Sequence, residues 1–297
     1  MNYDDPEDVI DEEYFLEHFA KRKDRRRPKG KRSIKALQSD SPAEPEAAEE
    51  GKLFHDPSLQ ALYERGLLRS LVYELQSGKE ATVYLAEGPQ GLLAAKVYRD
   101  REVRSFKNDQ DYRQGRYMND ARIKKALERC RQLGLNIREA LWIMYEYDQL
   151  WELHQAGLPV PRPLVGPGAQ DIAAAGRVVL MEYLGERDQP APRLSDITLE
   201  PAQAEQAFQE SVNLLVALLA LGKIHGDFST FNLLWWREKV YMIDFPQLVH
   251  VDEHPQAQHL LERDVRSLCQ SFKGLPYAPD PAALLADVRA RAKASSA

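Results

Sequence analysis

A polar segment in this sequence lies between a helix-like stretch and a predicted pair of short strands, which limits how the chain can fold. Positions 225–232 read HGDFSTFN, and positions 243–245 read IDF. Before them, residues 204–221 carry apolar side chains at helical spacing, and Gly222 supplies a C-terminal stop. Between them, two short β-like runs are joined by a charged turn, so a hairpin is predicted to return the second motif to the first.

The residue types in these two motifs suit phosphoryl transfer. That reaction needs a carboxylate beside the attacking oxygen and ligands for a metal ion that bridges the phosphates. Asp227 and Asn232 can place a carboxylate and an amide oxygen in one site, and Asp244 adds a second metal ligand. Such oxygen ligands suit Mg²⁺. Any one of them alone would be typical of a turn, whereas the ordered set indicates a phosphotransferase; for His225 we expect a loop-holding role.

The first half of the chain predicts an antiparallel meander. Short β-branched or aromatic runs separated by glycine turns occupy residues 71–75, 81–86 and 92–98. Lys96 lies in the middle of the third run, where a lysine needs a partner because desolvating its ammonium is costly. ATP phosphates and a helix carboxylate would supply that partner. Glu146, on the predicted helix between positions 141 and 153, is the candidate, and Glu152 is the alternative.

Two further segments complete the predicted nucleotide site. Residues 77–84 read SGKEATVY, with one glycine, so this is not the G-x-G-x-x-G loop of ordinary kinases. Ser77, Lys79 and backbone N–H groups are expected to cover the phosphates, although Ser-Gly-Lys turns are common. The apolar strand 178–183 is expected to connect the sheet to the helices. The predicted fold class is therefore α+β, bilobal and kinase-like, with a sheet-containing N-lobe at about 53–183 and a helical C-lobe at about 184–297.

Residues 1–52 differ in composition from the rest and predict a charged, mostly disordered tail before a domain at 53–297. Residues 21–35 hold ten Lys or Arg and one Asp. This basic block is either a solvated arm or a contact for RNA or an acidic partner. The first 51 residues carry ten basic and fourteen acidic side chains, which leaves about −2 for the remainder. Any nucleic-acid affinity is thus expected to reside in the arm.

The remaining bulk features point to a cytoplasmic protein. The two cysteines, Cys130 and Cys269, are far apart and form no metal or disulfide pattern. The first twenty residues are dominated by acidic side chains, unlike a secretory signal. The longest aliphatic run, 214–221, is too short to span a bilayer, so no membrane association is expected.

These motifs together resemble those of the RIO family of atypical serine kinases. The family's phosphate loop, S-x-G-K-E-A, is nearly matched by residues 76–81. Its catalytic segment, H-[AG]-D-[LF]-[SN]-x-[FY]-N, fits residues 225–232 at every position, and its metal segment, I-D-[FV]-[PS]-Q, fits residues 243–247. Further similarity lies at 157–163, 180–185 and 262–265, and the whole resemblance covers about 71–268.

The subfamily signals are mixed. Residues 106–116 resemble the flexible loop of the first RIO subfamily, whereas residues 244–247 and the His254-Pro255 pair look more like the second. The N-terminal region contains no stretch that suits the winged helix of the second group. We expect a divergent member nearer the first subfamily.

The resemblance implies a role for each matched residue in phosphoryl transfer. Asp227 would be the catalytic base. Asn232 and Asp244 would hold Mg²⁺, with Mn²⁺ as a substitute. Lys96, paired with Glu146, would position the α- and β-phosphates of ATP. In RIO proteins the aspartate that matches Asp244 is also implicated as a phosphoryl acceptor.

It also implies an adenine site and an anchor. The backbone of Glu182 and Leu184 would hydrogen-bond adenine, with Met181 behind the ring. Asp264 would hold the catalytic loop from a helix below it.

Several functions remain open at this point. The chain has no A-P-E motif and no long activation segment after Asp244, and RIO proteins lack these too. A kinase that acts on a protein serine or threonine, on itself or on a partner, and an ATPase switch are all compatible with the motifs. The alternatives are a small-molecule phosphotransferase of the aminoglycoside or choline kinase type and a non-catalytic nucleotide-switched assembly factor. By analogy with RIO proteins, the basic block 21–35 would meet RNA or a ribosomal precursor.

Overall fold

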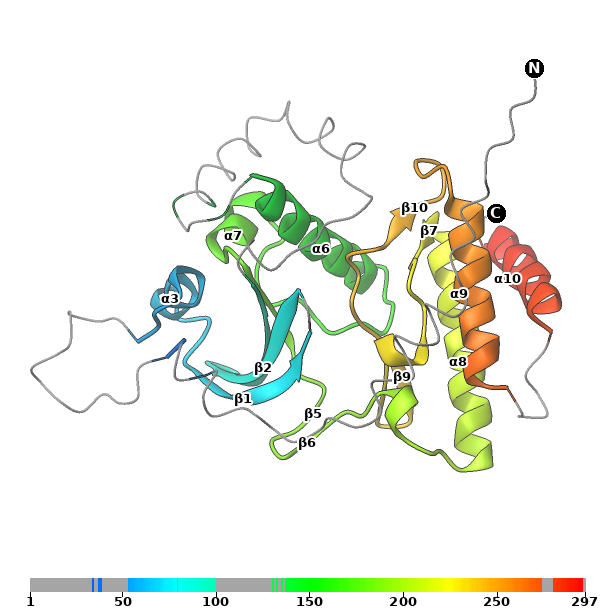
Figure 1. Cartoon of the computed structure of the whole chain (residues 1–297), viewed down its shortest axis with the longest axis horizontal. Coiled ribbons are helices and arrows are strands. Elements are labelled where there is room, and N and C mark those ends of the chain that lie inside the picture. The colour runs from blue at the N-terminus through cyan, green and yellow to red at the C-terminus, as the bar shows by residue number, and fades with distance from the viewer. Residues whose placement is uncertain are drawn as a thin grey trace, which may run out of the picture.

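The computed structural model describes residues 53–78, 80–99, 137–273 and 280–295, together with six separate positions between 34 and 135. Lys79, the segment 106–116 and almost all of the basic block 21–35 lie outside the described residues. The described part forms a sheet-containing N-lobe and a helical C-lobe, which lie side by side in Figure 1. The predicted α+β bilobal fold class is confirmed.

The N-lobe is built on a four-stranded antiparallel sheet. In order across the sheet, its strands are β1 (Ser70–Ser77), β2 (Ala81–Gly88), β3 (Gly91–Tyr98) and β4 (Val178–Glu182). The predicted strands match these to within two residues at each end. Strand β3 is central and buried over most of its length, because it pairs with β2 on one side and β4 on the other.

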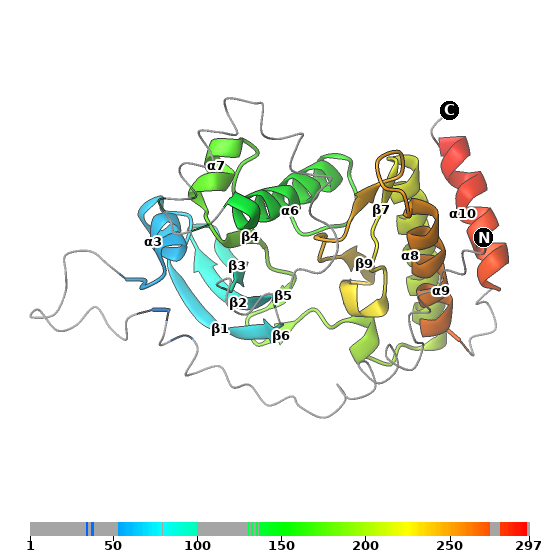
Figure 2. The ribbon, with the colours of Figure 1, turned by 45° about the horizontal axis from the view of Figure 1, so that its top comes forward.

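Helices cover this sheet and tie its distant segments together. The N-lobe helices are α3 (Pro57–Glu64), α6 (Ile137–Gln155) and α7 (Ala169–Ala174). Helix α6 packs against β4 and α7, and both helices lie on the same side of the sheet in Figures 1 and 2. The Asp56 carboxylate caps α3 by accepting hydrogen bonds from the Ser58 and Leu59 N–H groups. Helix α6 thus lies against the sheet although it lies far from β3 in the sequence.

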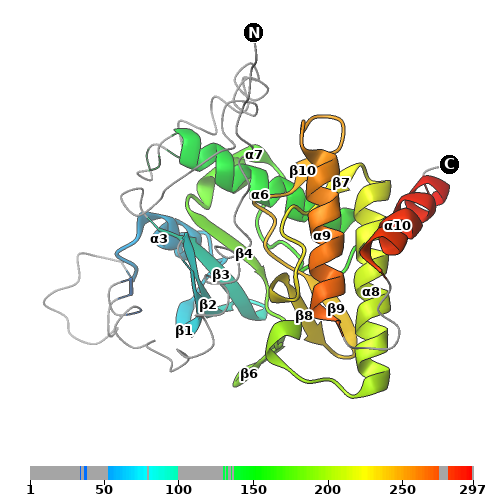
Figure 3. The same ribbon diagram turned by 45° about the vertical axis from the view of Figure 1, so that its right-hand side comes forward.

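The C-lobe is mainly helical and contains two pairs of short strands. Its elements are η2 (Leu194–Asp196), α8 (Pro201–Ala220), β7 (Lys223–Ile224), η3 (Thr230–Asn232), β8 (Leu233–Trp236), β9 (Lys239–Met242), β10 (Val249–His250), α9 (Ala257–Ser271) and α10 (Pro281–Ser295). A hairpin of β5 (Gly185–Glu186) and β6 (Gln189–Pro190) follows the connecting strand β4. Helices α8, α9 and α10 pack together, as Figure 3 shows.

The predicted helix and hairpin of the C-lobe are present. Helix α8 buries Phe208, Val212 and Leu215, which share the apolar face expected from the sequence. Gly222 adopts a φ of +68° just beyond its end, where a glycine avoids the strain of a side chain. Strands β8 and β9 pair through a tight turn whose two central residues, Arg237 and Glu238, both have positive φ, as type I′ hairpin turns require.

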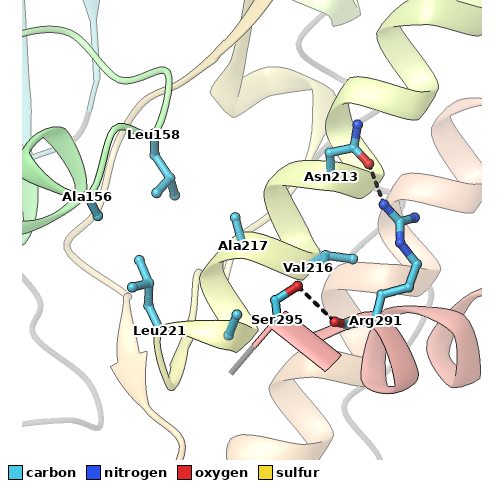
Figure 4. Close-up of a pocket in the computed structure, with 9 residues that line it drawn as sticks. Ala156, Leu158, Asn213, Val216, Ala217, Leu221, Arg291 and Ser295 are labelled. Atoms are coloured by element: carbon cyan, nitrogen blue, oxygen red, sulfur yellow. Dashed lines mark hydrogen bonds between the residues drawn. The ribbon is translucent and has the colours of Figure 1, made fainter. Parts of the chain in front are cut away.

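A depression of about 320 Å³ lies on the C-lobe, away from the predicted site residues. It lies between α8, α10 and the chain that follows α6, and Figure 4 shows Leu158, Ala217 and Leu221 at its apolar side. On its polar side, Arg291 donates a hydrogen bond to Asn213 Oδ1 at 2.5 Å. No described helix is both long enough and apolar enough to cross a membrane.

Candidate active site

The two lobes meet at the lysine of strand β3. Lys96 Nζ donates to Glu146 Oε1 at 2.6 Å and to Asp244 Oδ1 at 2.7 Å. Glu146 comes from helix α6 and Asp244 from the segment after β9, so three elements from both lobes converge on one ammonium. The alternative carboxylate, Glu152, instead pairs with Lys223 at 2.8 Å. The structure therefore brings together the lysine, the preferred glutamate and the aspartate that the sequence singled out.

Tyr98 is a member of this cluster that the sequence reasoning missed. Its hydroxyl donates to the second carboxylate oxygen of Glu146, and its ring centroid lies 5.2 Å from Lys96 Nζ. The sequence could have indicated Tyr98, because it lies two residues after Lys96 and residues two apart on a strand point to the same face. Both carboxylate oxygens of Glu146 therefore accept hydrogen bonds, one from Lys96 and one from Tyr98.

The charges of this cluster follow from burial and pairing. Burial lowers the pKa of Lys96, but the carboxylates of Asp244 and Glu146 outweigh it and raise the pKa above its ordinary value. Burial raises the pKa of Glu146, against the opposing effect of Lys96. Partial desolvation acts to raise the pKa of Asp244, yet the charge of Lys96 keeps it below its ordinary value. Lys96 therefore stays charged, which is the state that phosphate oxygens require.

Asp227 and Asn232 are held together in the loop between β7 and β8. Asn232 Nδ2 donates to the Asp227 carbonyl at 2.9 Å and to Asp227 Oδ2 at 3.0 Å. Burial raises the pKa of Asp227 to about 6, and the nearby charge of Asp244 acts in the same direction. The aspartate of this loop and the aspartate after β9 thus interact electrostatically across the site.

Helix α9 fixes the backbone of this loop. Asp264 accepts hydrogen bonds from Gly226 N at 2.8 Å and from Phe228 N at 3.0 Å, and the guanidinium of Arg263 donates to the Gly226 carbonyl. Gly226 has a φ of +77°, and a Cβ there would lie 2.6 Å from the Gln247 carbonyl oxygen. With this backbone conformation and this close approach of the two motifs, a side chain at position 226 would be strained.

His225 connects the same loop to the segment that carries Asp244. Its Nε2 lies 3.3 Å from the Ile243 carbonyl, and its Nδ1 lies 3.3 Å from the Asp227 N–H. Burial lowers its pKa to about 4, so the ring is neutral near pH 7. A neutral ring protonated on Nε2 satisfies both contacts. This arrangement suits the loop-holding role expected for His225.

The donors at this site fit a hard divalent cation that also binds phosphate. The Asp244 carboxylate, 44% exposed, and the amide oxygen of Asn232 are hard oxygen donors on the two facing segments. Among the described residues, no group of three or more His, Cys, Asp or Glu could hold a metal ion. Mg²⁺ commonly takes one or two protein carboxylates and completes its shell with waters and phosphate oxygens. The residues present fit such an ion.

The connecting strand places the predicted adenine-binding residues at the end of β4. Met181 pairs with Ala94 of β3, two residues from Lys96. The Glu182 N–H donates to the Arg162 carbonyl at 2.8 Å, and the Leu184 carbonyl accepts from Ala191 N at 3.0 Å. Within the described ranges, the Leu184 N–H has no backbone acceptor.

Ser77 lies at the β1–β2 turn, at the same end of the sheet as Lys96. It pairs with Thr82, which in turn pairs with Val97. Its hydroxyl accepts a hydrogen bond from Arg99 Nη2 at 2.6 Å. Arg99 is a second residue that the sequence reasoning did not single out, and it adds a positive charge beside the predicted phosphate loop.

The fold and these contacts define a class. A four-stranded sheet carries a lysine paired with a helix carboxylate, and one strand joins it to a helical lobe with a D-x4-N loop and a second aspartate. This is the arrangement of protein-kinase-like folds. Residues 72–279 match the family model described as the RIO domain, so the chain belongs to the RIO domain family.

Relatives of the same family match over most of the chain. A serine/threonine-protein kinase named RIO1 from Caenorhabditis elegans is 31% identical over 215 residues, which are 72% of this chain and 39% of that protein. A RIO-type serine/threonine-protein kinase Rio1 from Haloferax volcanii is 30% identical over 230 residues, 75% of this chain and 71% of the relative. The protein of the same name from Thermoplasma acidophilum is 28% identical over 199 residues, 67% of this chain and 94% of the relative.

Proposed function

We propose that this chain is a RIO-type serine/threonine protein kinase that transfers the γ-phosphate of ATP to a serine or threonine hydroxyl of itself or of another protein. The observation that carries the proposal is the contact of Lys96 with both Glu146 and Asp244, at 2.6 and 2.7 Å, across the two lobes. The names of the RIO relatives, which describe serine/threonine-protein kinases, support it.

Nucleotide binding is assigned to residues of both lobes. Lys96, oriented by Glu146, would position the α- and β-phosphates, and Ser77 and Lys79 would cover them from the β1–β2 turn. The backbone of Glu182 and the N–H of Leu184 would hydrogen-bond adenine, with Met181 behind the ring. Support comes from the position of Met181 beside β3 and from the unengaged Leu184 N–H within the described backbone.

Asp227 would act as the base. Its carboxylate would accept the proton of the attacking serine or threonine hydroxyl as the oxygen bonds to the γ-phosphorus and the bond to the β-phosphate oxygen breaks. The Asn232 amide, 3.0 Å from Asp227 Oδ2, orients that carboxylate. The pKa of about 6 keeps Asp227 largely ionised near pH 7 while leaving it more basic than an ordinary aspartate.

Asn232 and Asp244 would hold Mg²⁺, with Mn²⁺ as a substitute, through their side-chain oxygens. When bound, the cation would neutralise charge on the phosphates. The bond from Lys96 fixes Asp244 Oδ1, so this carboxylate is already oriented by the protein.

Incubation with γ-labelled ATP and Mg²⁺, followed by stability tests on the labelled protein, separates the candidate activities. Label that survives acid and hydroxylamine is a phosphoserine or phosphothreonine and supports the kinase. Label that hydroxylamine removes is an acyl phosphate, as expected if Asp244 accepts the phosphoryl group in an ATPase switch. Label that appears only on an added sugar or amino alcohol indicates a small-molecule phosphotransferase.

A Lys96→Met variant is the control for this experiment, because it keeps the length of the side chain and removes the ammonium. It should lose the label. If it is labelled as fast as the parent, the label does not come from this site, and an intact protein that neither binds nor consumes ATP contradicts the proposal.

We also propose that the protein works in the cytoplasm and that residues 21–35 contact RNA or a ribosomal precursor. The free, buried thiols of Cys130 and Cys269 suit a reducing compartment. The ten basic residues of the block, against one acidic residue, suit a polyanionic partner.

A further inference from the structure

A second buried lysine lies outside the cluster around Lys96. Lys223 opens strand β7, which leads directly into the catalytic loop, and its side chain is fully buried. Its ammonium donates to Gln149 Oε1 at 2.6 Å and to Glu152 Oε2 at 2.8 Å, and Nζ lies 3.2 Å from His250 Nε2. A buried ammonium is costly unless it is paired, so these contacts define the position of the side chain.

Two of the three partners belong to helix α6. Gln149 and Glu152 follow Glu146 by three and six residues, and residues three apart are neighbours on a helix surface. Gln149 is itself only 3% exposed. Lys223 therefore contacts α6 at Gln149, a surface neighbour of Glu146, and at Glu152, about 9 Å from Glu146 along the helix axis.

The residues of α6 on either side of Glu146, Tyr145 and Tyr147, attach the helix to both lobes. Towards the N-lobe, the Tyr147 hydroxyl donates to the Val178 carbonyl at 2.9 Å and accepts from Leu180 N at 2.7 Å. Towards the C-lobe, the Tyr145 hydroxyl donates to the Leu248 carbonyl, four residues after Asp244, at 2.8 Å. The contacts of Lys223 are the charged part of the C-lobe attachment.

We propose that Lys223 is a positioning residue for the phosphotransfer site, which holds α6 against β7 so that Glu146 meets Lys96. It acts through Glu146, since its own bonds go to Gln149, Glu152 and His250. The chain has no long activation segment after Asp244. In place of such a segment, the fixed contact between α6 and β7 keeps Glu146 aligned with the loop that carries Asp227. This inference rests on the proposed function.

The test measures equilibrium binding of ATP and Mg²⁺ to the full chain, together with kcat and KM. Lys223→Met removes the ammonium and leaves Gln149 Oε1 unsatisfied. It should weaken ATP binding and raise KM by about tenfold, the equivalent of one charge-assisted hydrogen bond, with a smaller effect on kcat. In a Glu146→Gln background the same substitution should have little further effect, because both changes act on one contact.

Two variants keep this inference falsifiable. The Glu152 side chain is 51% exposed and tolerates change, so Glu152→Gln should raise KM by less than Lys223→Met does. Leu284→Ala removes a buried side chain of α10, which packs on α8 and α9, and should lower thermal stability without changing ATP binding.

The outcomes separate failure of the proposed function from failure of the positioning role of Lys223. A parent protein that binds no ATP overturns the proposed function itself. A parent that binds ATP while Lys223→Met and Glu152→Gln bind it equally well overturns the positioning role alone. Equal weakening by Leu284→Ala also overturns it, because it means a general loss of stability, and full additivity with Glu146→Gln overturns it, because it means that Lys223 acts independently of Glu146.

Discussion

His225 shows how one buried ring can join two motifs. Its edge contacts the rings of Phe228 and Phe245, at centroid distances of 5.8 Å each, while its two nitrogens reach the backbone of both segments. Protonation would place a charge in this apolar setting and remove the acceptor at Nδ1. The His225 ring must therefore be neutral to keep its contacts with the Ile243 carbonyl and the Asp227 N–H.

This requirement predicts a pH dependence of stability. The pKa of His225 falls from 6.5 to about 4 on folding, so the unfolded chain takes up a proton that the folded protein does not. Stability from this residue is present above pH 6.5 and is lost as the pH falls towards 4, by about 3 kcal/mol in all. Urea unfolding at several pH values, for the parent and for His225→Asn, should show the steeper acid loss in the parent. Identical pH dependence would mean that the ring is not held neutral.

The residues of the site differ in how far the sequence could predict them. Lys96 stands out because a lysine in an apolar strand needs a partner. The choice between Glu146 and Glu152 depends on how α6 is rotated against β3, which no local pattern encodes. Once the helix is placed, Glu146 reaches Lys96 and Glu152 reaches Lys223. Tyr98 lies on the same face of β3 as Lys96 and shares its partner Glu146, so the strand period could have indicated it.

At the scale of elements, α9 holds the loop of residues 225–232, the proposed catalytic loop, through one carboxylate. Asp264 is 1% exposed and accepts from two backbone N–H groups of that loop. Burial raises the pKa of Asp264 to about 6, against the opposing effect of those two bonds. Helix α9 thus fixes the backbone on both sides of Asp227.

Removing this carboxylate should damage both stability and rate. Asp264→Ala leaves two buried N–H donors without their acceptor, at about 1–3 kcal/mol each. Asp264→Asn keeps one acceptor and should lose about half as much. Chemical unfolding gives the stability, and single-turnover phosphoryl transfer gives the rate. A variant that is destabilised but transfers phosphate at the parental rate would show that α9 supports the fold and not the site.

The elements themselves were predictable where a pattern extends over many residues. Strands β1 to β4 and helix α8 follow from β-branched runs, glycine turns and helical spacing. The pairs β5–β6 and β7–β10 were not predicted, because strands of two residues are too short to show alternation. The β7–β10 pair nevertheless places His250 beside Lys223, so an element invisible in the sequence completes a buried polar cluster.

At the scale of the whole molecule, the order of sheet, connecting strand and helices predicted the bilobal fold class, which is confirmed. The contact between the lobes was expected only as a meeting of side chains, and the structure supplies its geometry at Lys96 and Asp244. Two glycines, Gly222 and Gly226, occupy positive φ values where the chain turns into and through the catalytic loop. The family model matches residues 72–279, which agrees with the motif resemblance over about 71–268.

The basic block belongs to the same scale, because it would enlarge the molecule's binding surface beyond the two lobes. If residues 21–35 bind single-stranded RNA, deleting them should flatten the salt dependence of RNA binding. The log–log slope should fall by about 0.7 for each RNA phosphate that the block neutralises. A deletion of the acidic residues 4–17, similar in length, is the matched control and should leave the slope unchanged or steeper. An unaltered slope after removal of 21–35 would assign the block to a solvated arm.

We propose that Asp227, Asn232, Asp244 and Lys96 form one phosphotransfer site. The most direct measurement is the rate of γ-phosphoryl transfer at saturating ATP and Mg²⁺ for the parent and for Asp227→Ala, with the Kd for ATP measured on both. We predict a rate lower by about 10²–10⁴-fold in the variant, the usual contribution of a positioned base, with the Kd for ATP largely unchanged. Equal rates in the two proteins would contradict the account.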